Sequence, residues 1–91
     1  NMSDYKDILR ECESIATERM QKYGDPIESM QIACDILQKV FQIKLTIPEM
    51  CKVLIALKFS REHNEHQDDN IIDAINYLAI SLDFERKKQS L

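Results

Sequence analysis

The segment Gly24-Asp25-Pro26 restricts the fold most, because it joins the end of one helix directly to the start of another. Gly24 is the only glycine in the 91 residues, and glycine readily takes the left-handed conformation that closes a helix. Asp25 can cap the second helix, Pro26 fits its first position, and Glu28 is placed to complete a capping box. The sequence therefore predicts two helices joined by a very short turn.

The rest of the chain also predicts helices. With one Gly and two Pro, it lacks the turn residues that a β-sandwich or barrel needs about every 10 positions. Apolar residues recur at three- and four-residue spacing, and Thr46-Ile47-Pro48-Glu49 forms a second capping box. We expect a single all-α domain over residues 1–91, folded as a four-helix bundle. Its helices are predicted at about 3–22, 26–43, 47–61 and 69–86, with a polar loop over 62–67.

The helices expected at 47–61 and 69–86 carry more apolar residues than one buried stripe requires. The residues that cannot all face one small core are Ile55, Ile72, Leu78, Ala79 and Ile80. In a four-helix monomer some of them would face water, which a second interface would avoid. We therefore expect a homodimer or a higher homo-oligomer with these two helices at its centre.

Net charge and cysteine usage limit the partners and the compartment. A net charge of −4 argues against general DNA or RNA binding, although a local cationic pocket could still hold a small phosphorylated ligand. Cys12, Cys34 and Cys51 are odd in number and fall among apolar positions, which favours free buried thiols in a reducing compartment. The sequence shows no signal-peptide pattern and no apolar run of the roughly 18 residues that a membrane span needs. We expect a cytoplasmic protein, in a bacterium or an infected host cell, with no membrane contact.

A first group of candidate ligand-binding residues surrounds the glycine turn. Arg19, Lys22 and Tyr23 lie next to the N-terminus of the second predicted helix. Cationic side chains beside free backbone N–H groups suit a phosphate. Tyr23 has two interpretations, because its ring could stack on a base or could fasten the first turn to the core.

A second group brings charges of both signs together. Lys58 and Arg61 share a face at the end of the third predicted helix, and three- and four-residue steps along the fourth place on one face Asp69, Asp73, Asn76 and Tyr77. Asp73 lies in an otherwise apolar helix and needs a partner, which we expect to be Lys58 or Arg61. One interpretation is an interhelical salt-bridge network. The other is a polar pocket whose cations take phosphate oxygens, while Asp69 and Asp73 orient those cations or hold a divalent metal.

Three short motifs in this order resemble those of a known group of proteins. They are Lys-Tyr-Gly-Asp-Pro-x-Glu over 22–28, Lys-x-x-Arg over 58–61, and Asp-Asn-x-x-Asp-x-x-Asn-Tyr over 69–77. Together they resemble a group of small phage and prophage proteins, and they are similar to the nucleotide-modification-associated domains of phage genomes. A more distant resemblance is to the all-α nucleoside triphosphate pyrophosphohydrolases of the MazG type. The match runs from about residue 15 to 82. It implies an oligomeric, all-helical protein of nucleotide metabolism or phage–host conflict.

The chain departs from the pyrophosphohydrolases in its acidic residues. Enzymes of that fold bind Mg²⁺ through Glu-x-x-Glu on one helix and Glu-x-x-Asp on a later one. Here Asn70 to Asp73 stands at the later motif, whereas Glu49 on the preceding helix is followed three residues later by Lys52. Two-metal phosphate chemistry needs enough anionic ligands to hold the ions, so cations at this place would attract phosphate and repel Mg²⁺.

Our leading hypothesis is therefore a protein that binds a phosphorylated nucleotide without efficient turnover and sequesters a nucleotide signal. Its phosphates would contact Lys58 and Arg61, with help from Lys22 and Arg19, and its base would pack on Tyr23 or Tyr77. One alternative is a Mg²⁺-dependent nucleotide pyrophosphohydrolase of the MazG-like type. A second alternative is an oligomerisation module without a ligand.

Overall fold

The computed structural model describes residues 4–89, and within them the chain forms four α-helices and no strand. The helices are α1 (Tyr5–Tyr23), α2 (Pro26–Phe41), α3 (Ile47–Asn64) and α4 (Asp68–Gln89). The all-α prediction is confirmed for these residues. The predicted start of the first helix at residue 3 lies outside the described residues. None of the four helices combines the length and the apolar character that crossing a bilayer requires.

Three helix ends lie two or three residues from their predicted positions, and one of them is the end of α4, at Gln89 instead of residue 86. Helix α2 ends at Phe41 instead of residue 43, because Gln42 takes a left-handed conformation (φ 56°, ψ 31°) and its N–H donates to the Gln38 carbonyl. Helix α3 continues to Asn64, so that the loop predicted over 62–67 contains only residues 65–67. Polarity alone suggested a loop there, whereas the polar residue Glu62 is part of the helix and binds groups beyond its end.

The caps follow the sequence in most respects. Gly24 has a positive φ of 81°, as expected, but its ψ of −163° lies outside the left-handed helical region. The carboxylate of Asp25 accepts from the N–H of Ile27 at 2.9 Å, so the capping box predicted with Glu28 is wrong in this detail. At the start of α3 the predicted box forms in full: Thr46 N–H donates to Glu49 Oε1 at 2.9 Å, and Glu49 N–H donates to Thr46 Oγ1 at 3.2 Å.

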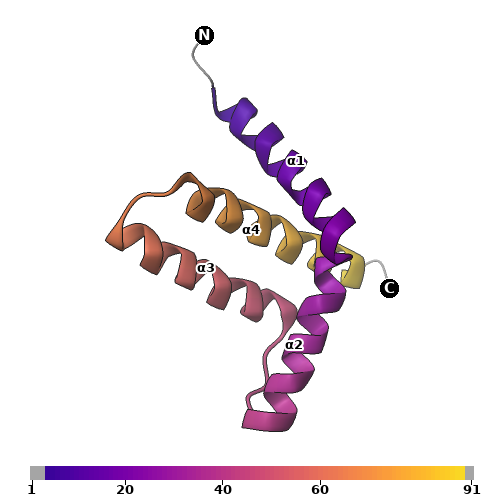
Figure 1. Ribbon diagram of the computed structural model, residues 1–91. Coiled ribbons are helices and arrows are strands. Elements are labelled where there is room, and N and C mark those ends of the chain that lie inside the picture. Colours follow the sequence, from indigo (N-terminus) through magenta and orange to yellow (C-terminus); the bar gives the residue numbers. More distant parts are fainter. Residues whose placement is uncertain (1–3, 90–91) are drawn as a thin grey trace.

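The helices form an open arrangement around an α3–α4 hairpin (Figure 1). Helices α3 and α4 run antiparallel with extensive contact, and α1 packs mainly on α4. Helix α2 contacts α3 and α4 but extends away from the hairpin toward the 42–46 connection. The Cα radius of gyration is 14.6 Å, whereas a compact domain of this length has a radius of about 12 Å. The chain is thus a four-helix fold that leaves much of each helix uncovered.

The main core lies where α2 meets the hairpin. Its buried members are Met30, Cys34, Ile47, Met50 and Cys51. Cys51 is fully buried, and its thiol contacts the Met30 sulfur at 3.6 Å. All three cysteines are buried and unbonded, as predicted, and burial raises the pKa of each thiol. These thiols therefore serve as small apolar side chains.

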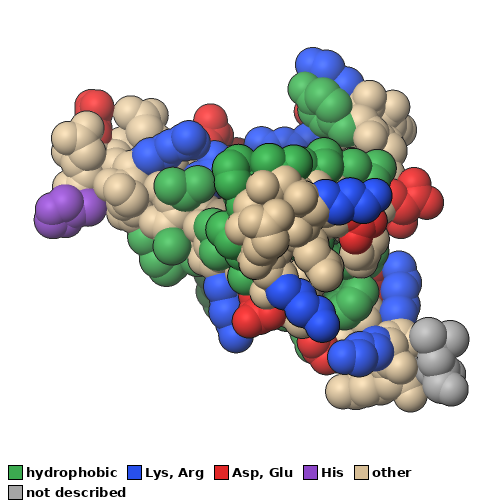
Figure 2. All heavy atoms as spheres, turned by 90° about the horizontal axis from the view of Figure 1, so that it is seen from below, with side chains coloured by type: hydrophobic (Ala, Val, Ile, Leu, Met, Phe, Trp, Pro, Cys, Tyr) green, Lys and Arg blue, Asp and Glu red, His purple; other side chains and the backbone are tan. Residues whose placement is uncertain are grey.

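Many apolar side chains remain on the surface. Among the apolar residues that one small core was not expected to hold together, Ile55 and Ile72 are buried, whereas Leu78 and Ala79 are exposed. Large exposed apolar residues occur on every one of the four helices. Figure 2 shows hydrophobic side chains spread across the lower face of the molecule. The prediction that part of the apolar surface faces water in a single copy is confirmed.

Candidate functional site

A buried carboxylate joins three helices. Asp73 on α4 has a side chain that is only 7% exposed, and both of its oxygens accept from cations. Arg19 Nη1, from α1, lies 2.7 Å from Oδ1, and Lys58 Nζ, from α3, lies 2.7 Å from Oδ2. The expected pairing of Asp73 with Lys58 is confirmed. Its second partner is Arg19 from the first helix, and not Arg61.

The electrostatics of this triad keep the carboxylate ionised. Burial alone raises the pKa of Asp73, but the hydrogen bonds and charges of Lys58 and Arg19 outweigh burial and hold the pKa below its usual value. The hydrogen bond to Asp73 raises the pKa of Arg19. The two cations differ in exposure, because the Lys58 side chain is 17% exposed and the Arg19 side chain 49%. Lys58 is the enclosed partner and Arg19 the accessible one.

The triad borders a groove of about 620 Å³ between the α1–α2 turn and α4. Arg19, Asp73 and Asn76 form a polar edge, while Asp83 and Lys87, paired at 2.9 Å, also line the groove. Apolar side chains cover much of the remaining wall, among them Met20, Ile27, Met30, Leu54 and Ile80. The rings of Tyr23 and Tyr77 also line it. Its volume lies within the range of about 300–1,000 Å³ that is usual for small-molecule sites.

The groove gathers only part of the residues proposed from the sequence. Four of them line the groove, namely Arg19, Tyr23, Asp73 and Tyr77. Lys58 is not a lining residue, but it contacts Asp73, which is. The Lys22 ammonium lies 5.2 Å from the centre of the Tyr23 ring, a cation–π contact. Lys22, Arg61 and Asp69 are exposed and are not among the lining residues. That these three contact a ligand stays a prediction.

Sequence reasoning placed Asn76 on the face of Asp73 but missed two other lining residues on α4. Asn76 donates from Nδ2 to the carbonyl oxygen of Cys12 on α1 at 3.1 Å, which fixes one wall. Asp83 and Lys87 were not considered. The signal was present, because the three- and four-residue steps that lead from Asp73 to Asn76 continue through Ile80 to both of these residues.

The surroundings of Asp73 do not suit Mg²⁺. Magnesium prefers carboxylate and water oxygens in an octahedral shell, whereas each Asp73 oxygen is already bonded to a cationic side chain. Within residues 4–89, no cluster of three or more His, Cys, Asp or Glu side chains is arranged to hold a metal ion. Asp69, the other metal ligand proposed from the sequence, is exposed.

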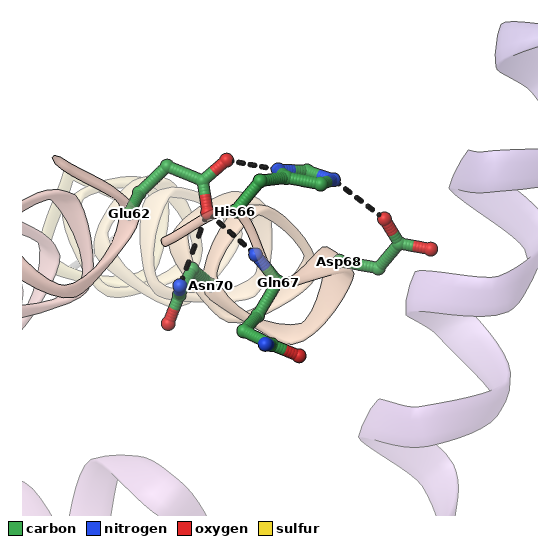
Figure 3. A network of polar contacts seen from close by, with 5 residues as sticks. All are labelled: Glu62, His66, Gln67, Asp68 and Asn70. Carbon is green, nitrogen blue, oxygen red and sulfur yellow. Dashed lines mark hydrogen bonds and ion pairs between the residues drawn. The ribbon is translucent and has the colours of Figure 1, made fainter. Parts of the chain in front are cut away.

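A second polar cluster closes the α3–α4 turn (Figure 3). The Glu62 carboxylate binds the His66 ring, the Gln67 N–H at 2.9 Å and the Asn70 amide at 3.1 Å. These bonds lower the pKa of Glu62 to about 2, the bond to His66 contributing most. The other ring nitrogen of His66 contacts Asp68 at 2.9 Å, and the bonds to Glu62 and Asp68 raise the pKa of His66. Since its members bind one another, this cluster fastens the turn.

Comparison with known proteins gives one result. A family model described as a domain of unknown function, DUF6378, matches residues 7–85, which include the three residues of the triad and every lining residue of the groove except Lys87. The chain belongs to the DUF6378 family. No curated protein and no solved structure matches it. The groove and its side chains are the features of this DUF6378 chain that bear on its function.

Proposed function

We propose that this protein binds a phosphorylated nucleotide in the groove beside Asp73, without efficient turnover. The observation that carries the proposal is the unequal exposure of the two cations on one buried carboxylate. Arg19 can turn from Asp73 to a phosphate, while Lys58 continues to neutralise Asp73. A guanidinium suits this exchange because it binds phosphate oxygens in a planar, bidentate manner.

The remainder of the groove fits the rest of a nucleotide. Tyr23 and Tyr77 offer aromatic faces to a base, and stacking on such rings contributes about 1–3 kcal/mol per base. Asn76 lies on the same edge as Arg19, although its amide already donates to the Cys12 carbonyl. The apolar wall favours a flat ring over a fully hydrated sugar phosphate. This arrangement supports binding through one phosphate end and one base end.

The proposal is tested by thermal unfolding with mono-, di-, tri- and cyclic nucleotides, each with and without Mg²⁺. A ligand at 100 times its Kd adds about 2.7 kcal/mol, which corresponds to a rise of roughly 10–20 °C in Tm for a domain of this size. Arg19→Gln should weaken the best ligand at least tenfold, because it removes a charge-assisted hydrogen bond of about 1.5–3 kcal/mol.

Arg10→Gln is the matched control. Arg10 is an exposed cation on the same helix, paired with Asp7 at 2.6 Å and outside the groove. Its substitution should leave the affinity unchanged. The proposal is wrong if no nucleotide raises Tm at millimolar concentration, or if Arg19→Gln binds the best ligand as tightly as the wild type.

The wider setting is also a proposal. The motifs at 22–28, 58–61 and 69–77 support a homo-oligomeric, cytoplasmic protein of phage or prophage type, with a fold related to the MazG-like pyrophosphohydrolases. In that setting the bound nucleotide would be a sequestered signal. Release of pyrophosphate from a nucleoside triphosphate with Mg²⁺ would instead support the enzyme. An absence of both binding and turnover would leave the oligomerisation module.

A further inference from the structure

Helix α2 is apolar on two sides. One side faces the core through Met30, Cys34 and Leu37. A second stripe, at four-residue steps, consists of Ile32, Ile36 and Val40, which are 61%, 52% and 59% exposed. A helix on the surface of a monomer needs only one apolar stripe, and a helix that is apolar on further sides is typical of a buried element. Within residues 4–89, no second layer covers this stripe.

Not all of the exposed apolar surface of α2 lies on this stripe. Phe41 is also exposed, but it follows Leu37 by four residues and so continues the core-facing side, at the end of α2 that extends beyond the hairpin (Figure 1). Ile32, Ile36 and Val40 together present on the order of 300 Å² of apolar surface. A standard interface buries about 800 Å² on each partner, of which roughly 60% is apolar. The stripe therefore supplies more than half of the apolar area that one side of a stable dimer needs.

Two charges beside the stripe indicate the orientation of the partner. Glu28 and Lys39 are both exposed and lie eleven residues apart, about three helical turns, so they flank the same edge of the stripe near its opposite ends. If a second α2 packs antiparallel about a two-fold axis, Glu28 of each copy faces Lys39 of the other. A parallel two-fold arrangement would place these edges on opposite sides of the seam, so that Glu28 would not face Lys39.

We infer that the outer face of α2 binds the same face of a second copy of this chain, with the two helices antiparallel. The contact is isologous, as expected of a two-fold dimer, and it covers Ile32, Ile36 and Val40. Ser29, one turn before Ile32, lines the groove, so the second copy also lies beside the groove. This inference does not depend on nucleotide binding.

Sedimentation velocity across a range of protein concentrations tests the interface. The wild-type chain should sediment as a dimer or as a multiple of dimers. Ile36→Glu should raise the dissociation constant at least 100-fold, because it places a charge at the centre of the stripe on both copies. Leu78→Glu is the matched control, since Leu78 on α4 is a comparably exposed apolar residue away from α2. Its dissociation constant should stay within about threefold of the wild type. Circular dichroism of both variants should show unchanged helix content.

Charge reversal tests the orientation. Glu28→Lys alone should weaken the dimer about tenfold by opposing Lys39 of the partner subunit, and the addition of Lys39→Glu should restore it. A monomeric wild type, a dimer that survives Ile36→Glu, or dissociation by Leu78→Glu would overturn the assignment to α2. Failure of the double reversal to restore a weakened dimer, or no effect of the single reversal, would overturn the antiparallel arrangement.

Discussion

Asp73→Asn is the substitution that most directly tests the account of the triad. Asparagine keeps the shape of the side chain and removes the charge that both cations share. Lys58, with a side chain only 17% exposed, then lies in a largely enclosed place without its counter-charge. Arg19, 49% exposed, can return to water. Most of the loss therefore arises from Lys58.

The magnitude follows from this difference. Removing one member of a buried ion pair costs about 3–5 kcal/mol, whereas an exposed pair contributes about 0–1 kcal/mol. We expect Asp73→Asn to lower the free energy of unfolding by about 3 kcal/mol, and Arg19→Gln by less than about 1 kcal/mol. For a domain of this size the first loss corresponds to a fall of roughly 12–24 °C in Tm.

Urea unfolding followed by circular dichroism measures these differences, and a double-mutant cycle adds a sharper criterion. Lys58→Met removes the stranded charge and keeps an apolar stem. The variant carrying both Asp73→Asn and Lys58→Met should therefore be more stable than Asp73→Asn alone. If Arg19→Gln destabilises the chain as much as Asp73→Asn, or if Lys58→Met brings no recovery, the assignment of Lys58 as the enclosed partner is refuted.

Four further predictions concern turns and caps. Gly24→Ala should cost about 1–3 kcal/mol in urea unfolding, because a non-glycine residue resists the observed φ of 81° although no atom lies within 4 Å of the added Cβ; an unchanged midpoint would contradict this. Thr46→Val should cost about 1 kcal/mol through the lost cap of α3, while Thr46→Ser should retain most of it. Glu62, with a pKa of about 2 against an ordinary 4.5, stabilises the fold above pH 4.5, and this contribution should disappear as the pH falls from 4.5 to 2. His66, with a raised pKa, contributes fully below pH 6.5 and loses its contribution as the pH rises through its folded-state pKa, so His66→Gln should flatten the alkaline side of a Tm–pH profile.

Local signals predicted the helices well. The caps at Gly24, Asp25 and Thr46 are local chemistry, and α1, α2 and α3 each begin or end next to one of them. The end of α3 was misplaced because Glu62 acts at a distance, by binding groups that follow the turn. A polar run looks the same whether it is solvated or bonded to the next helix.

Contacts between segments distant in the sequence were harder to predict than the helices. The need of Asp73 for a cation followed from its apolar helix, and Lys58 was found because it lies on the adjoining helix. Arg19 is 54 residues away from Asp73, and nothing in a single sequence distinguishes it from the other cations. The outward stripe of α2 was overlooked for a similar reason, since periodicity identifies apolar faces but not which of them the fold covers.

The contacts that attach α1 to α4 affect how readily this helix opens away from the rest of the protein. Two polar contacts, Arg19 to Asp73 and the Cys12 carbonyl to Asn76, join α1 to α4. Segments with few buried contacts open before the rest of a protein, so amide hydrogens in α1 should exchange with solvent sooner than those in the α3–α4 hairpin. A ligand bound by the Arg19 guanidinium would favour the closed position of α1. Binding in the groove would then slow deuterium uptake along the whole of α1, although most of this helix does not contact the ligand.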